Sequence, residues 1–209
     1  MKTYKVKLVI LLYLIGGNVF SQNDTLIVAN NYKLKVGVKG LLEKSKASFI
    51  PGVKPVYNFG VQGIYKIGRT KSSIETGAYH YIRSFDSEYK DTNTSFQILN
   101  EIVYKNIHIP INYRLDTRVV YFSLGVYVDY IYSLTTDNFS EYIKKGYENN
   151  FFSMGYDISI GIEKNISSLF SFFVEAESSV DITSIHNKGE IKLLNYGFAI
   201  GINYKILKK

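Results

Sequence analysis

YFSLGVYVDYIYS, the stretch from Tyr121 to Ser133, decides the fold of this chain. One parity of the stretch is apolar or aromatic throughout: Phe122, Leu124, Val126, Val128, Tyr130 and Tyr132. The other parity is mostly small, polar or charged. Because successive side chains of a strand point to opposite faces, the stretch predicts a strand with one continuous apolar face. At about 3.3 Å per residue it covers roughly 40 Å, and a transmembrane strand needs only about 9 to 11 residues.

The same alternation returns in seven other stretches. They are Asn31 to Glu43, Tyr57 to Ile67, Ser73 to Phe85, Ile98 to Arg114, Phe152 to Glu163, Phe170 to Asp181 and Leu194 to Lys205. The connections alternate long and short, and the residues from Asp86 to Gln97 form one of the long polar ones. This rhythm is typical of an up-and-down meander. We therefore predict an all-β fold, an eight-stranded antiparallel up-and-down transmembrane β-barrel. Pro110 cannot donate to the ladder, so either a bulge lies there or the assignment of that stretch as a strand is wrong.

The polar parity indicates which face points outward. It is rich in Gly, Ser, Asn and Ala, which suit the narrow interior of an eight-stranded barrel. A soluble barrel would instead carry large charged residues outside and bulky apolar ones inside. The apolar parity is therefore expected to face lipid. Its tyrosines near strand ends are expected to form interfacial girdles: Tyr57, Tyr65, Tyr113, Tyr132, Tyr196 and Tyr204.

The larger polar-parity side chains carry both signs of charge. A charge shut inside a lumen must be paired, because an unpaired buried charge costs several kcal/mol. The pattern predicts a self-neutralising charge network that fills the lumen. Its expected members are Lys35, Lys39, Lys66, Arg83, His108, Arg114 and Lys205 with Glu75, Asp129, Asp157, Glu163, Glu175, Glu177 and Asp181. Lys33 shares the inward parity, and His108 is expected beside Arg114 and Tyr104.

The N-terminus has the pattern of an export signal. Lys2, Lys5 and Lys7 precede the apolar run from Leu8 to Ile15, and Val19-Phe20-Ser21 has the form of a cleavage site. We expect a signal peptide at residues 1–21, a short periplasmic segment at 22–30 and a barrel domain at 31–209. No later run offers 18 consecutive apolar residues, and the chain has no cysteine. Removal of three of the 25 basic residues leaves 22 against 18 acidic ones, which is too mild to indicate nucleic-acid binding.

Several short pieces of the chain resemble the PorT-type family of outer-membrane β-barrels from Bacteroidetes. These pieces are Phe20-Ser21-Gln22, the stretch IHIPI from Ile107 to Ile111, Leu124 to Tyr127, Gly155 to Ile158 and Gly201 to Tyr204. The resemblance implies bacterial outer-membrane location and an eight-stranded barrel. One relative takes part in protein secretion, and most members have no assigned activity. The chain departs from the pattern by continuing past Tyr204 with Lys205 to Lys209, where such barrels often end in an aromatic residue.

No catalytic residue, cofactor or metal site is predicted. His80, His108 and His186 form no pair at helical spacing. Glu175 and Glu177 share a face, as paired acid and base carboxylates do, but pairing with lumen cations is favoured. A hydrolytic site at the loop rim would have to draw together His186, Ser184, Asp181 and Asp137. In the long polar connection from Thr135 to Asn150, Phe139, Tyr142 and Tyr147 interleave with Lys144 and Lys145. These residues are a candidate contact surface for a partner or for lipopolysaccharide.

These observations favour a non-enzymatic outer-membrane barrel with a structural or binding role through its long loops. Its expected partners are outer-membrane lipids, lipopolysaccharide and an envelope or secretion protein, with no nucleic acid. The alternatives are a narrow transport pore, a protein-secretion accessory, a soluble lipocalin-like carrier and a hydrolase with its site at the rim.

Overall fold

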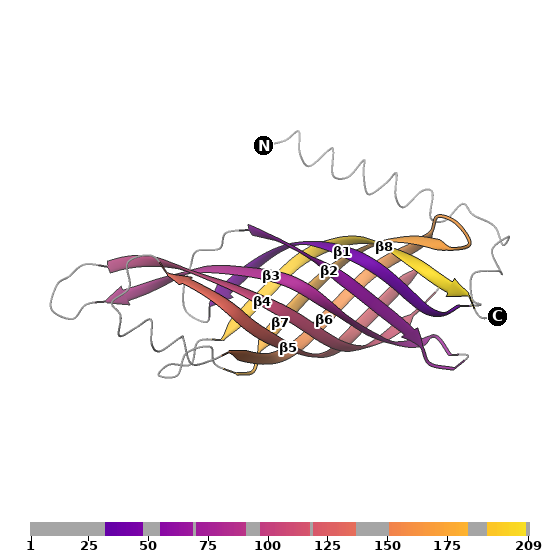
Figure 1. Ribbon diagram of the computed structural model, residues 1–209, viewed down its shortest axis with the longest axis horizontal. Coiled ribbons are helices and arrows are strands. Elements are labelled where there is room, and N and C mark those ends of the chain that lie inside the picture. The colour runs from indigo at the N-terminus through magenta and orange to yellow at the C-terminus, as the bar shows by residue number, and fades with distance from the viewer. Residues whose placement is uncertain are drawn as a thin grey trace, which may run out of the picture. The chain divides into compact units, whose positions relative to one another are not determined.

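The computed structural model describes residues 32–47, 55–68, 70–90, 97–117, 119–136, 151–183 and 192–207. Eight strands follow one another around a closed barrel, each antiparallel to its neighbours, and the last strand pairs with the first (Figure 1). They are β1 (Tyr32–Ala47), β2 (Pro55–Lys66), β3 (Ser72–Lys90), β4 (Gln97–Asp116), β5 (Val120–Thr136), β6 (Phe152–Asn165), β7 (Phe170–Asp181) and β8 (Leu193–Leu207). The predicted eight-stranded antiparallel up-and-down barrel is confirmed.

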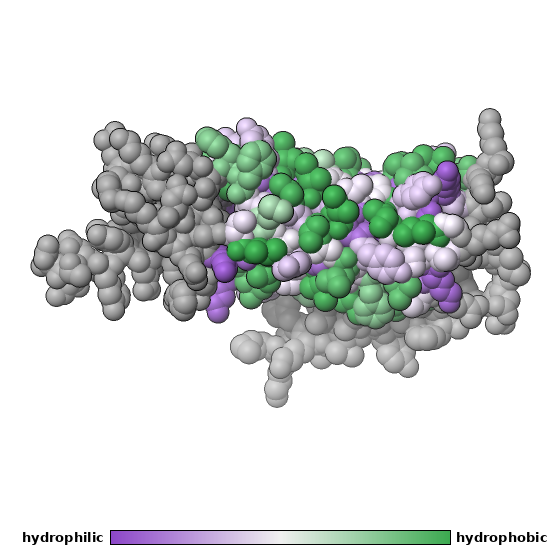
Figure 2. Space-filling view, turned by 90° about the horizontal axis from the view of Figure 1, so that it is seen from below, coloured by the Kyte–Doolittle hydropathy of each residue, from purple (hydrophilic) through white to green (hydrophobic). Residues whose placement is uncertain are grey.

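The alternation of the sequence becomes the two faces of the wall. On β5, Leu124 is 60% exposed, whereas Tyr121 and Tyr127 on the other parity are each 1% exposed. The same division holds on the other strands, and Figure 2 shows hydrophobic side chains spread over one outer face. All six tyrosines expected in the girdles lie on the outside. The barrel therefore has a polar interior and an apolar exterior, the reverse of a water-soluble protein. Within these described ranges, no helix has the length and apolar character needed to span a membrane.

The hairpin of β3 and β4 is longer than predicted. Residues from Asp86 to Gln97 were expected to form a loop, yet the ladder continues to Lys90 opposite Gln97. The pairing of β3 with β2 ends much earlier, at His80 opposite Phe59. Beyond that point the backbone N–H of Ile82 donates to Asn58 Oδ1 at 2.8 Å. A side chain of β2 thus provides a hydrogen-bond acceptor for β3 two residues beyond the end of the ladder.

Pro110 lies within β4 without a bulge, so the assignment of this stretch as a strand is correct. The register of β3 and β4 is the same on both sides of it, from Thr76 opposite Ile111 to Tyr79 opposite His108. The ladder is only interrupted there, and Thr76 Oγ1 donates to the Pro110 carbonyl at 2.7 Å. The bulge of this region lies instead on β5 at Tyr132, because Asn106 pairs with Ile131 and Lys105 with Ser133.

A second register shift corrects the expected direction of Lys33. The pairing of β1 with β8 is irregular between Tyr32 and Leu34. Lys33 is consequently exposed, with its ammonium 5.5 Å from the ring centre of the outward-facing Tyr65. The interior parity of β1 therefore begins at Lys35.

Candidate functional site: the charged lumen

The lumen holds three groups of paired charges, which follow one another from the tight turns to the long connections. The first group centres on Arg114, close to the turn after β4. Its guanidinium contacts three carboxylates: Nε lies 2.9 Å from Asp116, Nη1 lies 3.4 Å from Glu75, and Nη2 pairs with Glu163. The guanidinium also lies 3.5 Å from the ring centre of Tyr121. Planar multiple contact of this kind is a property of arginine that lysine does not reproduce.

Glu163 connects this group to the other side of the barrel. Lys35 Nζ lies 2.8 Å from its Oε1, the hydroxyl of Ser171 donates to the same oxygen, and Asn203 Nδ2 donates to it at 3.3 Å. These residues belong to β1, β6, β7 and β8, whereas Arg114 belongs to β4. The Glu163 carboxylate on β6 thus contacts side chains of β4, β1 and β8, none of which pairs with β6.

The middle group centres on Lys39. Its ammonium pairs with both Glu175 and Glu177 and lies 5.2 Å from the ring centre of Tyr79. Tyr121 donates to Glu175 at 2.6 Å, and Tyr81 donates to Glu177 at 3.0 Å. The two glutamates are therefore held by one shared cation and one phenol each, which is an arrangement for neutralising charge.

The third group lies toward the long connections and centres on Asp129. Arg83 Nη1 lies 2.6 Å from Asp129, and its distance to Asp181 is 3.6 Å. His108 lies between two carboxylates, with Nδ1 2.7 Å from Asp129 and Nε2 3.3 Å from Asp157. Its ring stacks on Tyr81, with 4.4 Å between ring centres and 3° between planes. The expectation that His108 lies beside Arg114 is corrected, since its charged partners are Asp129 and Asp157.

The remaining predicted members lie at the edges of these groups. Lys205 is buried and donates to Asn165 Oδ1, and Lys66 lies half-buried with its ammonium 5.3 Å from the ring centre of Tyr32. Asp181 accepts a hydrogen bond from Tyr127 inside the barrel.

Sequence reasoning missed two kinds of lumen residue. Glu43 is 2% exposed and accepts a hydrogen bond from Asn58 at 2.8 Å, and its shared parity with Lys35 and Lys39 was the available signal. The tyrosines that bond the carboxylates were also overlooked as network members, namely Tyr81, Tyr121 and Tyr127. Their inward parity was visible, but bulky aromatic residues are more often assigned to the lipid side.

Other predicted sites fall elsewhere. Phe139, Tyr142, Lys144, Lys145 and Tyr147 lie outside the described residues, as do Asp137, Ser184 and His186 and the N-terminal segments 1–21 and 22–30. Over the strands and short turns that the structure describes, no group of three metal-ligating side chains converges.

Two tyrosines fit into the lumen because glycine lies on the neighbouring strand. A Cβ added to Gly161 would overlap the ring of Tyr121, and one added to Gly155 would overlap Tyr127. Tyr121 is 1% exposed and hydrogen-bonded to Glu175, so its ring has little room to move.

Gly161→Ala is therefore expected to lower the free energy of unfolding by about 1–3 kcal/mol, the usual cost of overpacking. Urea unfolding in detergent micelles, followed by tyrosine fluorescence, measures the change. Gly63→Ala is the matched control, because a Cβ at Gly63 meets nothing within 4 Å. Equal stability of the two variants would contradict the close packing of Tyr121 against Gly161.

Comparison with known proteins shows the fold and no more. No family model matches the chain, and no curated protein sequence matches it. Among solved structures, Neisserial surface protein A has a TM-score of 0.50 at 11% identity, covering 83% of this chain and 97% of that one. The outer membrane protein OprG from Pseudomonas aeruginosa has a TM-score of 0.54 at 13% identity, covering 87% of this chain and 100% of that one. The resemblance to PorT-type barrels stays a prediction from the sequence.

Proposed function

We propose that this chain is an integral barrel of the bacterial outer membrane, non-enzymatic, with a closed lumen and a structural or binding role. The observation that carries the proposal is the exposed apolar belt. Outward residues such as Phe59, Ile111, Leu124, Ile158 and Phe198 are all more than half exposed. Water-soluble monomers rarely expose contiguous apolar patches larger than a few hundred Å². A belt that surrounds the barrel needs hydrocarbon as its solvent.

The lumen supports a binding or structural role rather than transport. Lys39, Arg83 and Arg114 each pair with at least two carboxylates, and these three cationic side chains are themselves at most 7% exposed. Contact with lipopolysaccharide or an envelope partner is assigned to the long connections between strands. Assistance to protein secretion is the finer role that the PorT-type resemblance supports.

The proposal is tested by refolding the chain in detergent micelles and comparing its gel mobility in dodecyl sulfate before and after boiling. A closed membrane barrel is expected to resist dodecyl sulfate and to shift in mobility only on boiling, while a sample without detergent aggregates. A soluble monomer with no shift would contradict the proposal, and would favour the lipocalin-like carrier.

Electrical recording across a planar bilayer separates the closed barrel from the narrow pore. We expect no sustained current from the folded chain, because paired side chains fill the lumen. Sustained single-channel current would overturn the closed lumen while leaving the membrane location intact.

A further inference from the structure

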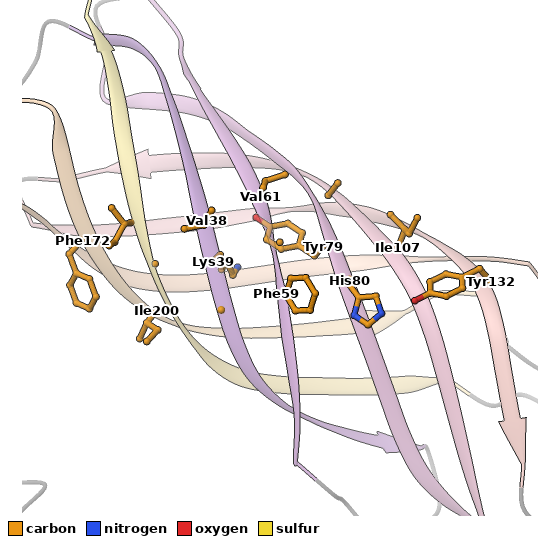
Figure 3. Close-up of a pocket in the computed structure, with 15 residues that line it drawn as sticks. Val38, Lys39, Phe59, Val61, Tyr79, His80, Ile107, Tyr132, Phe172 and Ile200 are labelled. Carbon is orange, nitrogen blue, oxygen red and sulfur yellow. The ribbon is translucent and has the colours of Figure 1, made fainter.

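A long groove crosses the outer face of the barrel. It has a volume of about 890 Å³, and its wall comes from β7, β8, β1, β2, β3, β4 and β5. Two rows of outward side chains border it, each running from strand to strand through direct pairing partners. One row is Phe172, Ile202, Val38, Val61 and Ala78, and the other is Ile200, Gly40, Phe59, His80 and Ile107. In Figure 3 the labelled members of these rows follow one another across the strands, from Phe172 and Ile200 past Val38 and Phe59 to His80 and Ile107.

The hollow exists because each row contains one small residue. Gly40 faces outward on β1, and a Cβ added there meets nothing within 4 Å. Ala78 faces outward on β3 and is exposed. Between them the walls are aliphatic and aromatic, with Val38, Val61 and Phe59 between 57% and 65% exposed. The groove is therefore apolar along most of its length.

The groove descends obliquely across the membrane. His80 lies eight residues from Ser72, where β3 leaves its tight turn, whereas Phe172 lies two residues from Phe170, where β7 leaves its own. One end of the groove is thus toward the long connections and the other toward the tight turns. From β3 to β7 there are four inter-strand steps of about 4.8 Å, or roughly 19 Å. One leaflet contributes about 15 Å of hydrocarbon, so the groove has room for one acyl chain.

Polar side-chain groups on its walls gather at the end near the long connections. His80 is half-buried, stacks on Phe59 with 5.3 Å between ring centres, and its Nδ1 has no hydrogen-bond partner among the described residues. Tyr132, the extra residue of the β5 bulge, lies with its ring centre 6.1 Å from that of His80. In Figure 3 the hydroxyl of Tyr132 is turned toward the side on which His80 lies.

We propose that this groove binds one phosphate-bearing acyl lipid of the leaflet nearer the long connections. One acyl chain lies between Gly40 and Ala78, and a phosphate or ester oxygen accepts hydrogen bonds from the His80 imidazole and the Tyr132 hydroxyl. The inference rests on the proposed membrane location. An amphiphile fits the groove better than a second copy of the barrel, because the groove is apolar along its length and polar at one end only.

Native mass spectrometry of the full chain tests the site, with dimyristoyl phosphatidylglycerol added to detergent micelles. We expect one retained lipid per barrel. Gly40→Leu fills the hollow and is expected to weaken lipid retention roughly tenfold. If Gly40→Leu does not fold, Ala78→Leu replaces it, with the same expected effect. His80→Phe keeps the ring stack and removes the donor, so it is expected to weaken retention roughly three- to tenfold. Dimyristoyl glycerol has no phosphate and serves to identify the acceptor. If phosphate is the acceptor, His80→Phe is expected to leave the retention of dimyristoyl glycerol unchanged. If an ester oxygen is the acceptor, His80→Phe is expected to weaken that retention.

Gly63→Leu is the matched control, because Gly63 also faces outward into open space but lies outside the groove. Equal lipid retention by Gly40→Leu and Gly63→Leu would overturn the site. A dimer of the wild-type chain that Gly40→Leu abolishes would also overturn it, because the groove would then bind a second copy of the barrel. Each variant is first checked for the mobility shift on boiling. Absence of that mobility shift in the wild-type chain would overturn the membrane location itself. A wild-type chain that shows the shift but retains lipid no better than the groove variants would overturn the lipid site alone.

Discussion

Lys39→Met is expected to lower the free energy of unfolding by about 3–5 kcal/mol, the usual cost of breaking a buried ion pair by removing one partner. The Lys39 side chain is 7% exposed, and its ammonium pairs with both Glu175 and Glu177. Methionine fills similar space but leaves two carboxylates close together without their shared cation. Urea titration in detergent micelles, followed by the boiling-dependent mobility shift, measures the loss.

Lys44→Met is the matched control on the same strand, since Lys44 is exposed and faces outward. It is expected to change stability by less than about 0.5 kcal/mol. Adding Glu175→Gln and Glu177→Gln to Lys39→Met is expected to restore part of the loss, because the uncompensated charges are then gone. Equal stability of the Lys39 and Lys44 variants would show that the lumen is hydrated enough to screen its charges.

Val126→Arg is expected to destabilise the inserted barrel by about 2–4 kcal/mol, the cost of an arginine on the lipid face at the middle of a bilayer. Val126 lies midway along the outward row of β5 and is 45% exposed. Unfolding from lipid vesicles in guanidinium chloride measures the effect.

Ile206→Arg provides the comparison, because Ile206 faces outward near the end of β8 and the cost falls to about 0–1 kcal/mol at the interface. A depth-dependent difference between the two variants is the expected outcome. Were Val126→Arg neutral and the protein soluble without detergent, the outer face would be in contact with water.

The fold was predictable because each strand carries its own evidence. The alternation of apolar and polar residues identifies β5, β6 and β8 as strands without reference to the rest of the chain. A closed barrel is the arrangement that gives every such strand two neighbours. The inward direction of Arg83, Arg114 and Asp129 followed from parity alone. Where parity failed, at Lys33, a register shift between β1 and β8 had moved the side chain outward.

The contacts inside the lumen were not predictable in the same way. Glu163 on β6 meets Arg114 on β4 and Lys35 on β1, and these strands are not adjacent in the sheet. Which charges meet depends on how far each strand is shifted along the barrel, and a single sequence does not show that stagger. His108 illustrates the limit, because its inward direction was correct and its expected neighbour Arg114 was not.

Closure of the barrel by β1 and β8 determines how the chain must assemble. Tyr32 pairs with Leu207 and Ala47 with Leu193, so the two strands farthest apart in sequence form one seam. Contacts of such long sequence separation form slowly, because the entropy of closing the intervening loop is lost before the contacts stabilise it. Until the seam closes, both strands present unpaired backbone edges that can pair with another chain. Safe assembly therefore depends on protection of these two edges until the barrel closes.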